Sequence, residues 1–288
     1  MKLTGAQILM EVLKEEGVDA IFGFPGGATI DIHDHLERTD IRHYLVRHEQ
    51  GAVHAADGYA RVTGKVGVCL VTSGPGATNA VTGVATAYMD SIPLVIISGQ
   101  VPTHLIGNDA FQEVDIVGIT RPCTKHNYLV PSVEELPRIL KEAFHIARSG
   151  RPGPVLVDIP KNVQQATANF KPGQKVKLKS YNPTYKPNAK QLQKVAALIK
   201  TAKRPVIFAG GGVILSKAAD DLTRLARSTK IPVAIPVEAL PFLPVTNSTI
   251  IAMTNVSAIA ISGQKEGILL KMFSIMRNIL VCVSSCVR

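Results

Sequence analysis

Residues 47–52 read Arg47-His48-Glu49-Gln50-Gly51-Ala52, and residues 71–79 read Val71-Thr72-Ser73-Gly74-Pro75-Gly76-Ala77-Thr78-Asn79. The first stretch places the carboxylate of Glu49 where an apolar strand pattern gives way to a helical one. The second stretch opens the next helix with a Gly-Pro-Gly turn. Open α/β sheets bind ligands beyond the carboxyl ends of their parallel strands, so two successive junctions of this kind predict a ligand site with a buried acid.

The chain repeats this alternation of short apolar strands and amphipathic helices up to residue 160. Such a pattern predicts an α/β fold with a doubly wound parallel sheet and helices on both faces. The run at 66–72 is continuously apolar, as expected for a strand that is covered on both sides. The predicted strands are 19–24, 41–46, 66–72, 93–98 and 155–159, and the predicted helices are 7–16, 29–38, 49–63, 77–88 and 132–148, the last capped by Ser132.

Three parts follow from the pattern. Residues 1–165 form the first α/β domain, and residues 166–187, which are rich in Pro, Lys and Asn, form a linker. Residues 188–288 begin a second α/β domain, in which a helix at 189–201 and a strand at 205–209 precede three glycines. From about residue 236 the periodicity is lost, so we expect this second domain to be incomplete and its tail divergent.

Composition argues against several classes of protein. No apolar run reaches the roughly 20 residues of a membrane helix, and residues 1–4 lead into a helix pattern without a signal or transit segment. The four cysteines are sparse, which favours a reduced, cytoplasmic setting. The net charge of +10 is concentrated in the acid-free stretch between Asp158 and Asp220. Because no zinc spacing or RNA-binding signature accompanies that stretch, we interpret it as solvated and expect no nucleic-acid or membrane partner.

Taken singly, the candidate residues leave alternatives open. An acid in the first turn of a helix, such as Glu49, more often stabilises the helix than acts as a catalyst. Gly26-Gly27 and the turn at 74–76 either make tight turns or let the backbone approach a ligand closely. No metal site is predicted, because the nearby polar residues lack the spacing of metal ligands and are interpreted as structural: His48, His54 and Asp57.

Together, however, the ordered motifs resemble the thiamine diphosphate enzymes. The motifs that carry this resemblance are 24–28, 48–52, 58–61, 72–79 and 90–93. Within that group, 98–101, 109–115 and 124–126 resemble the catalytic subunit of biosynthetic acetohydroxyacid synthase (acetolactate synthase), and 151–161 continues the match. The resemblance covers about residues 1–235.

The resemblance implies a role for each matched residue. Glu49 corresponds to the glutamate that hydrogen-bonds the aminopyrimidine N1′ of thiamine diphosphate and so acts as the catalytic carboxylate. Gly26 and Gly27 correspond to a loop near the reactive carbon. The other matched residues flank the aminopyrimidine (Pro75, Asn79), reach the substrate or its channel (Phe111, Gln112, Lys161) or contact FAD (Arg151, Gly210, Gly211, Gly212).

The parent reaction that the resemblance implies is decarboxylation of pyruvate and carboligation to a second 2-ketoacid, pyruvate or 2-ketobutyrate, in branched-chain amino acid biosynthesis. The implied cofactors are thiamine diphosphate, FAD and Mg2+, and the implied assembly is a homodimer or tetramer with a possible regulatory small subunit. The family holds the diphosphate and Mg2+ through a Gly-Asp-Gly motif, and no Gly-Asp-Gly occurs in this sequence. We therefore expect these 288 residues alone to be inactive.

The unusual tail admits three explanations: a disrupted reading frame, a truncated remnant, or a short protein with another task. The composition of 239–288 favours the first. Two alternative functions are open. One is an interaction fragment that pairs with an intact subunit, and the other is a different thiamine diphosphate enzyme, such as a glyoxylate carboligase. The run at 109–115 argues against the last.

Overall fold

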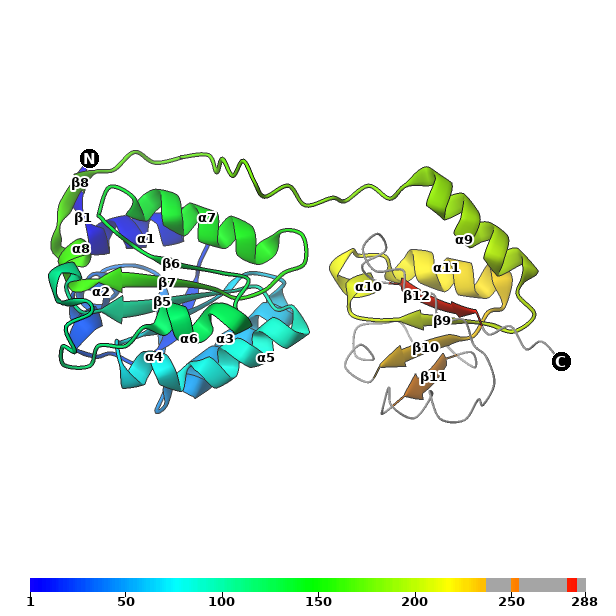
Figure 1. The fold of residues 1–288 in the computed structure, drawn as a ribbon, viewed down its shortest axis with the longest axis horizontal. Coiled ribbons are helices and arrows are strands. Elements are labelled where there is room, and N and C mark those ends of the chain that lie inside the picture. Colours follow the sequence, from blue (N-terminus) through cyan, green and yellow to red (C-terminus); the bar gives the residue numbers. More distant parts are fainter. Residues whose placement is uncertain (237–249, 254–278, 284–288) are drawn as a thin grey trace. The chain divides into compact units, whose positions relative to one another are not determined.

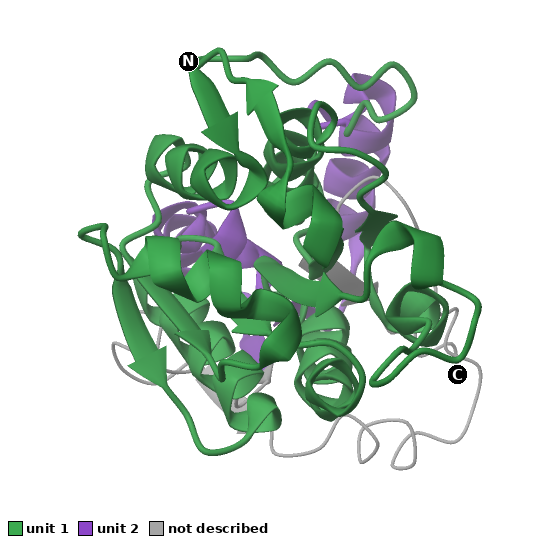
Figure 2. Ribbon diagram, turned by 90° about the vertical axis from the view of Figure 1, so that its left-hand side faces the viewer, with its two compact units in different colours: residues 1–183 green, residues 184–288 purple. Residues whose placement is uncertain are grey.

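The computed structural model describes residues 1–236, 250–253 and 279–283. It divides the chain into two compact units, residues 1–183 and residues 184–288, which Figure 2 colours separately. Most of the tail predicted to diverge from about residue 236 lies outside the described residues. None of the helices within the described ranges is long and apolar enough to cross a membrane.

Unit 1 is built on a six-stranded sheet in the order β3-β2-β4-β5-β7-β6. All its neighbouring strands pair in parallel. The predicted doubly wound parallel sheet is therefore confirmed. The strands are β2 (Ala20–Gly23), β3 (Arg42–Leu45), β4 (Gly67–Val71), β5 (Leu94–Gln100), β6 (His126–Leu129) and β7 (Val155–Pro160).

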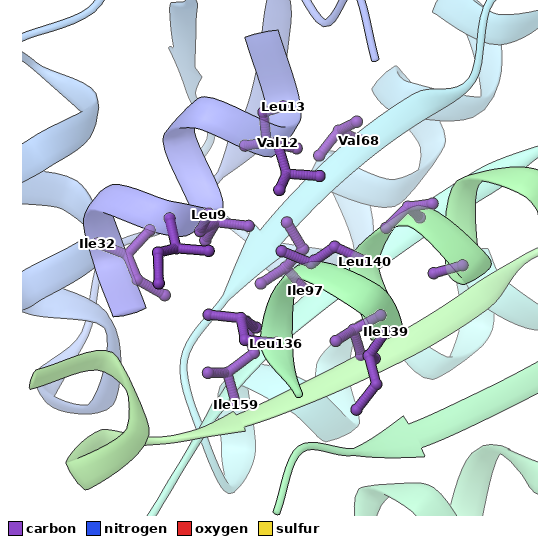
Figure 3. Close-up of a cluster of buried hydrophobic side chains, with 14 of the residues drawn as sticks. Leu9, Val12, Leu13, Ile32, Val68, Ile97, Leu136, Ile139, Leu140 and Ile159 are labelled. Carbon is purple, nitrogen blue, oxygen red and sulfur yellow. The ribbon is translucent and has the colours of Figure 1, made fainter. Parts of the chain in front are cut away.

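Helices cover both faces of this sheet (Figure 1). One apolar cluster joins the sheet to α1 (Gly5–Glu15), α2 (Ile30–Leu36) and α7 (Leu136–Arg148) and includes Leu9, Ile97 and Leu140 (Figure 3). The other cluster joins it to α3 (Glu49–Thr63), α4 (Pro75–Asn79), α5 (Val81–Asp90) and α6 (Ile116–Thr120). Alternate residues of one strand supply the two clusters, because successive side chains of a strand point to opposite faces.

Local sequence explains where these helices begin and end. Thr4 and Gln7 form a capping box at the start of α1, so that two backbone N–H groups of the first turn are satisfied. The His48 ring accepts a hydrogen bond from the backbone of Gln50 at the start of α3. The same helix ends at Gly64, whose left-handed φ of 71° suits a residue without a β-carbon.

The first residues of the predicted linker belong to unit 1. β8 (Thr167–Asn169) pairs antiparallel with β1 (Lys2–Thr4), and Phe170 is buried in the first apolar cluster. Short helical segments complete this unit: α8 (Lys161–Gln165) and the 3-10 turns η1 (Gly27–Thr29), η2 (Thr103–Leu105) and η3 (Arg121–Cys123).

Unit 2 has a smaller sheet in the order β11-β10-β9-β12. Its inner strands pair in parallel, while β12 runs antiparallel to β9. Ile207, Val213 and Leu222 belong to its apolar core. The elements are α9 (Ala189–Thr201), β9 (Pro205–Ala209), α10 (Gly212–Leu215), α11 (Ala219–Thr229), β10 (Val233–Pro236), β11 (Ile250–Met253) and β12 (Ile279–Val283).

Two local predictions in unit 1 were wrong, and one strand was missed. The single helix predicted at 77–88 is two helices, since α4 begins at Pro75 and α5 follows Ala80. Ser132 does not cap α7, which begins four residues later behind Glu135. Strand β6, His126–Leu129, was not predicted, because it is a half-polar strand at the edge of the sheet that is defined by its pairing with β7.

We expect Leu140→Ala to lower the free energy of unfolding by about 2–5 kcal/mol, because truncation leaves a cavity beneath a helix. Leu140 is completely buried, whereas Val62 on α3 is 81% exposed, so Val62→Ala is the control and should have little effect. Urea titration followed by circular dichroism measures both. Equal effects of the two variants would contradict the assignment of α7 to the core.

Candidate cofactor site

The candidate site lies at the carboxyl edge of the large sheet. Glu49 is the first residue of α3 and is 8% exposed. The Asn79 side chain donates a hydrogen bond from Nδ2 to Glu49 Oε2 at 3.0 Å. No hydrogen bond to Oε1 comes from any residue that the structure describes. The positive end of the α3 dipole stabilises a negative charge at this position. Two residues predicted from different helices, Glu49 and Asn79, are thus brought together.

Glycine allows the backbone to lie against this carboxylate. A β-carbon built on Gly76 would stand 3.1 Å from Glu49 Oε1 and 2.7 Å from Thr72 Cγ2. A β-carbon on Gly26 would stand 2.5 Å from Thr72 Cβ, so the backbone of Gly26 lies against the same side chain. The alternative that the Gly-Pro-Gly stretch only makes a turn does not explain the contact at Gly76, which requires a residue without a side chain.

Thr72 is a site residue that we did not single out from the sequence. Its Oγ1 accepts a hydrogen bond from the backbone N–H of Ala28 at 3.3 Å, which ties the loop after β2 to the turn after β4. The signal was present, since Thr72 lies inside the stretch quoted first. Its role became visible only when pairing of β2 with β4 placed the two loops side by side.

Two further predicted residues reach the same edge. The Lys161 ammonium donates to the backbone carbonyl of Gly27 at 3.1 Å, so α8 meets the loop after β2. The backbone of Gln112 lies against Gly74, where an added β-carbon would stand 2.6 Å from the Gln112 carbonyl oxygen. Phe111, beside it, is 88% exposed. Pro75 is the exposed first residue of α4.

The residues assigned to FAD belong to different units and are described separately. Arg151, in unit 1, donates from Nε to Ser91 Oγ at 2.7 Å and from Nη2 to the Met89 carbonyl at 3.4 Å. In unit 2, the triplet Gly210–Gly212 joins β9 to α10. A β-carbon added at Gly210 or Gly211 would meet no atom within 4 Å, so the space beside their backbone is open.

Burial sets the electrostatics around the site. Burial raises the pKa of the Cys69 thiol, and the nearby Glu49 charge raises it further, so Cys69 stays a neutral thiol. Burial also raises the pKa of Asp158 to about 7, although hydrogen bonds from Ser98 and Gln100 act in the opposite direction. Over the described residues, no group of three or more His, Cys, Asp or Glu side chains could hold a metal ion.

Comparison with known proteins identifies the family of both units. Residues 3–119 match the thiamine pyrophosphate enzyme N-terminal TPP binding domain, and residues 192–261 match the central domain of the same enzymes. The central-domain match therefore runs past residue 236, where the divergent tail was predicted to begin. The chain thus belongs to the thiamine pyrophosphate enzymes.

Two relatives within that family are acetolactate synthase large subunits. The chain is 58% identical over 233 residues to the acetolactate synthase large subunit of Mycobacterium tuberculosis, which covers 81% of the chain and 38% of the relative. It is 50% identical over 257 residues to the acetolactate synthase large subunit of Haemophilus influenzae, covering 88% of the chain and 44% of the relative. The chain is a homologue of this large subunit and spans about two fifths of its length.

The close contact at Gly76 can be tested by adding a methyl group. We expect Gly76→Ala to lower the free energy of unfolding by about 1–3 kcal/mol, because the new β-carbon overlaps Thr72 and presses on Glu49. Gly58→Ala is the matched control on α3, where an added β-carbon meets no atom within 4 Å. Since alanine suits a helix interior better than glycine, Gly58→Ala should raise stability by about 0.5–1 kcal/mol. An equal gain in stability for Gly76→Ala would contradict the close contact of Gly76 with Thr72 and Glu49.

Asp158 makes stability depend on pH. Its folded-state pKa of about 7 lies above the ordinary 3.8, so the folded protein binds this proton more tightly than the unfolded chain does. The resulting stabilisation is fully present below pH 3.8 and is lost as pH rises through about 7.

Urea titrations should therefore show that the free energy of unfolding falls between about pH 4 and about pH 8. This fall should be smaller in Asp158→Asn, because asparagine does not ionise. Asp34→Asn, at an exposed carboxylate of α2, is the control and should retain the wild-type fall. An unchanged profile in Asp158→Asn would contradict the raised pKa.

Proposed function

We propose that residues 1–183 provide the half-site that binds the aminopyrimidine ring of thiamine diphosphate, with Glu49 as its catalytic carboxylate. The observation that carries this proposal is the buried Glu49 carboxylate, oriented through Oε2 by Asn79 and bordered by Gly76. A carboxylate oxygen that receives no described hydrogen bond, beside backbone without side chains, fits the edge of a flat heterocycle that carries a ring nitrogen.

The chain's own residues then have defined tasks. Glu49 Oε1 shares a proton with the ring nitrogen, and Asn79 keeps the carboxylate from rotating. Pro75 and Asn79 border the ring. Gly26 lets its loop lie against Thr72, and Gly27, where an added β-carbon would meet no atom within 4 Å, leaves space for the reactive part of the cofactor. When bound, thiamine diphosphate supplies the carbanion chemistry. We assign Phe111, Gln112 and Lys161 to the substrate side.

The reaction we propose is carboligation of two 2-ketoacids, pyruvate with pyruvate or 2-ketobutyrate. The relatives named acetolactate synthase support this choice over other thiamine diphosphate enzymes. The name large subunit also supports a small regulatory partner. We further propose that copies of the chain pair through the helices of unit 1, where Tyr88 and Met89 on α5 are exposed.

The remaining cofactors are assigned on weaker grounds. We propose that Arg151 and Gly210–Gly212 contact FAD, which the exposed guanidinium and the open glycine turn support. Mg2+ and the diphosphate are assigned to no residue of these 288, because the sequence contains no Gly-Asp-Gly.

A chimera tests the role of Glu49. The matched residues of this chain replace the corresponding part of the Mycobacterium tuberculosis large subunit, to which they are 58% identical. We expect acetolactate formation from pyruvate, and we expect Glu49→Gln in the chimera to lower kcat by about 10²–10⁴. Glu11→Gln, which removes a carboxylate from the exposed side of α1, is the control. Full activity of the Glu49→Gln chimera would refute the assignment.

Residues 1–288 expressed alone provide a second test. With pyruvate, thiamine diphosphate, Mg2+ and FAD we expect no acetolactate, because the aminopyrimidine half-site alone does not anchor the diphosphate. Turnover by these residues would show that they also hold the diphosphate. Coexpression with an intact large subunit distinguishes the interaction-fragment alternative, which requires the two chains to copurify.

A further inference from the structure

Three polar side chains interrupt the apolar face at the carboxyl ends of β5 and β7. On the face that supplies Leu94, Ile96 and Leu156 to the second apolar cluster, the strands continue with Ser98 and Gln100 on β5 and Asp158 on β7. The strand register places Asp158 directly opposite Ser98. All three are buried, with 0%, 4% and 1% exposure for Ser98, Gln100 and Asp158.

Their hydrogen bonds use the amide of Gln100 fully. Asp158 Oδ1 accepts from Ser98 Oγ at 2.7 Å, and Oδ2 accepts from Gln100 Nε2 at 2.9 Å. Gln100 Nε2 also donates to the carbonyl of Val114 at 2.9 Å, while Oε1 accepts from the backbone N–H of Val101 at 2.9 Å. Rotating this amide by half a turn would place donors against Val101 N–H, so its orientation is determined.

Val114 is the end of the loop that carries Phe111 and Gln112. That loop is internally braced, because the Glu113 carboxylate accepts hydrogen bonds from the backbone N–H groups of Gly107 and Ala110. Its beginning is held separately by Asn162, which exchanges hydrogen bonds of 2.9 Å with Thr103. Its far end is held at Val114 by Gln100. The Val114 carbonyl also accepts from the Ile116 backbone N–H at 2.9 Å. The braced segment therefore takes its position from its two ends and from the Gln112 backbone, which lies against Gly74.

We propose that Gln100, oriented by Asp158, is the positioning residue that sets where Phe111 and Gln112 stand relative to Glu49. The assignment of these two side chains to substrate rests on the proposed function, whereas the anchoring of the loop does not. A purely apolar continuation of β5 and β7 would fill the core equally well. Burying an amide and a carboxylate is favourable only when their hydrogen bonds are made, and here one of those bonds reaches outside the sheet to the loop.

Backbone ¹⁵N relaxation of the 288-residue chain tests the anchor. In the wild-type chain we expect order parameters of about 0.85 for the amides of Gly107, Ala110 and Gln112, and in Gln100→Leu we expect values below about 0.6. Leucine occupies a similar volume but cannot bridge Asp158 and Val114. The remaining backbone of the large sheet should stay rigid.

Gln164→Leu is the matched control. Gln164 is equally buried, and its Nε2 donates to two backbone carbonyls, those of Ala28 and Ile159, but to none in the 101–115 loop. It should lower the urea midpoint without changing the order parameters of the loop. If both variants loosen the loop, or neither does, Gln100 is structural and the proposal is overturned.

Asp158→Ala removes both carboxylate acceptors and provides a second variant should Gln100→Leu not fold. Gln100 Nε2 then loses the Asp158 oxygen that orients it, so the bridge to Val114 should loosen and the loop order parameters should fall. Order parameters that match the wild type would overturn the proposal. If the substitution loosens the loop but the chimera that carries the wild-type sequence of this chain forms no acetolactate, the proposed function is refuted and the anchoring of the loop still holds.

Discussion

The Thr72 side chain is the point on which the geometry of this edge of the sheet depends. The loop after β2 and the turn after β4 both lie against it, because Gly26 and Gly76 have no β-carbon to separate the backbone from it. Its hydroxyl also accepts the Ala28 N–H. The Glu49 carboxylate can therefore approach the Gly76 backbone and receive Asn79. Gly26, Gly76 and Thr72 therefore hold the loop after β2 and the turn after β4 against each other.

Burial of polar groups at strand ends is the second constraint. The central strands of a doubly wound sheet are apolar through most of their length, since helices cover both faces. Glu49, Thr72, Ser98, Gln100 and Asp158 are buried polar residues, and each is at or just beyond the carboxyl end of a strand or at the helix that follows. Each also has a hydrogen-bond partner from another segment. These hydrogen bonds are needed because burying a polar group without a partner would cost free energy of folding.

The described residues contain the whole N-terminal domain match but only part of the central-domain match. Unit 1 contains the match to the N-terminal TPP binding domain, and its sheet and both apolar clusters lie within the described residues. Unit 2 contains the match to the central domain, residues 192–261. That match extends past residue 236, where the first unbroken range of described residues ends. The chain spans about two fifths of the relatives' length. The structural argument for a cofactor site therefore rests on unit 1.

The sequence alone determined the fold class, five of the six strands of the large sheet and the candidate Glu49, because periodicity and capping are local properties. It also determined helices such as α3 and α9 to the residue. It did not determine strand β6, the break between α4 and α5, or the roles of Thr72 and Gln100. Those depend on which strands become neighbours: pairing of β2 with β4 brings Ala28 to Thr72, and the register of β5 with β7 brings Asp158 to Gln100. Contacts between segments distant in sequence are decided by the sheet, which no local pattern encodes.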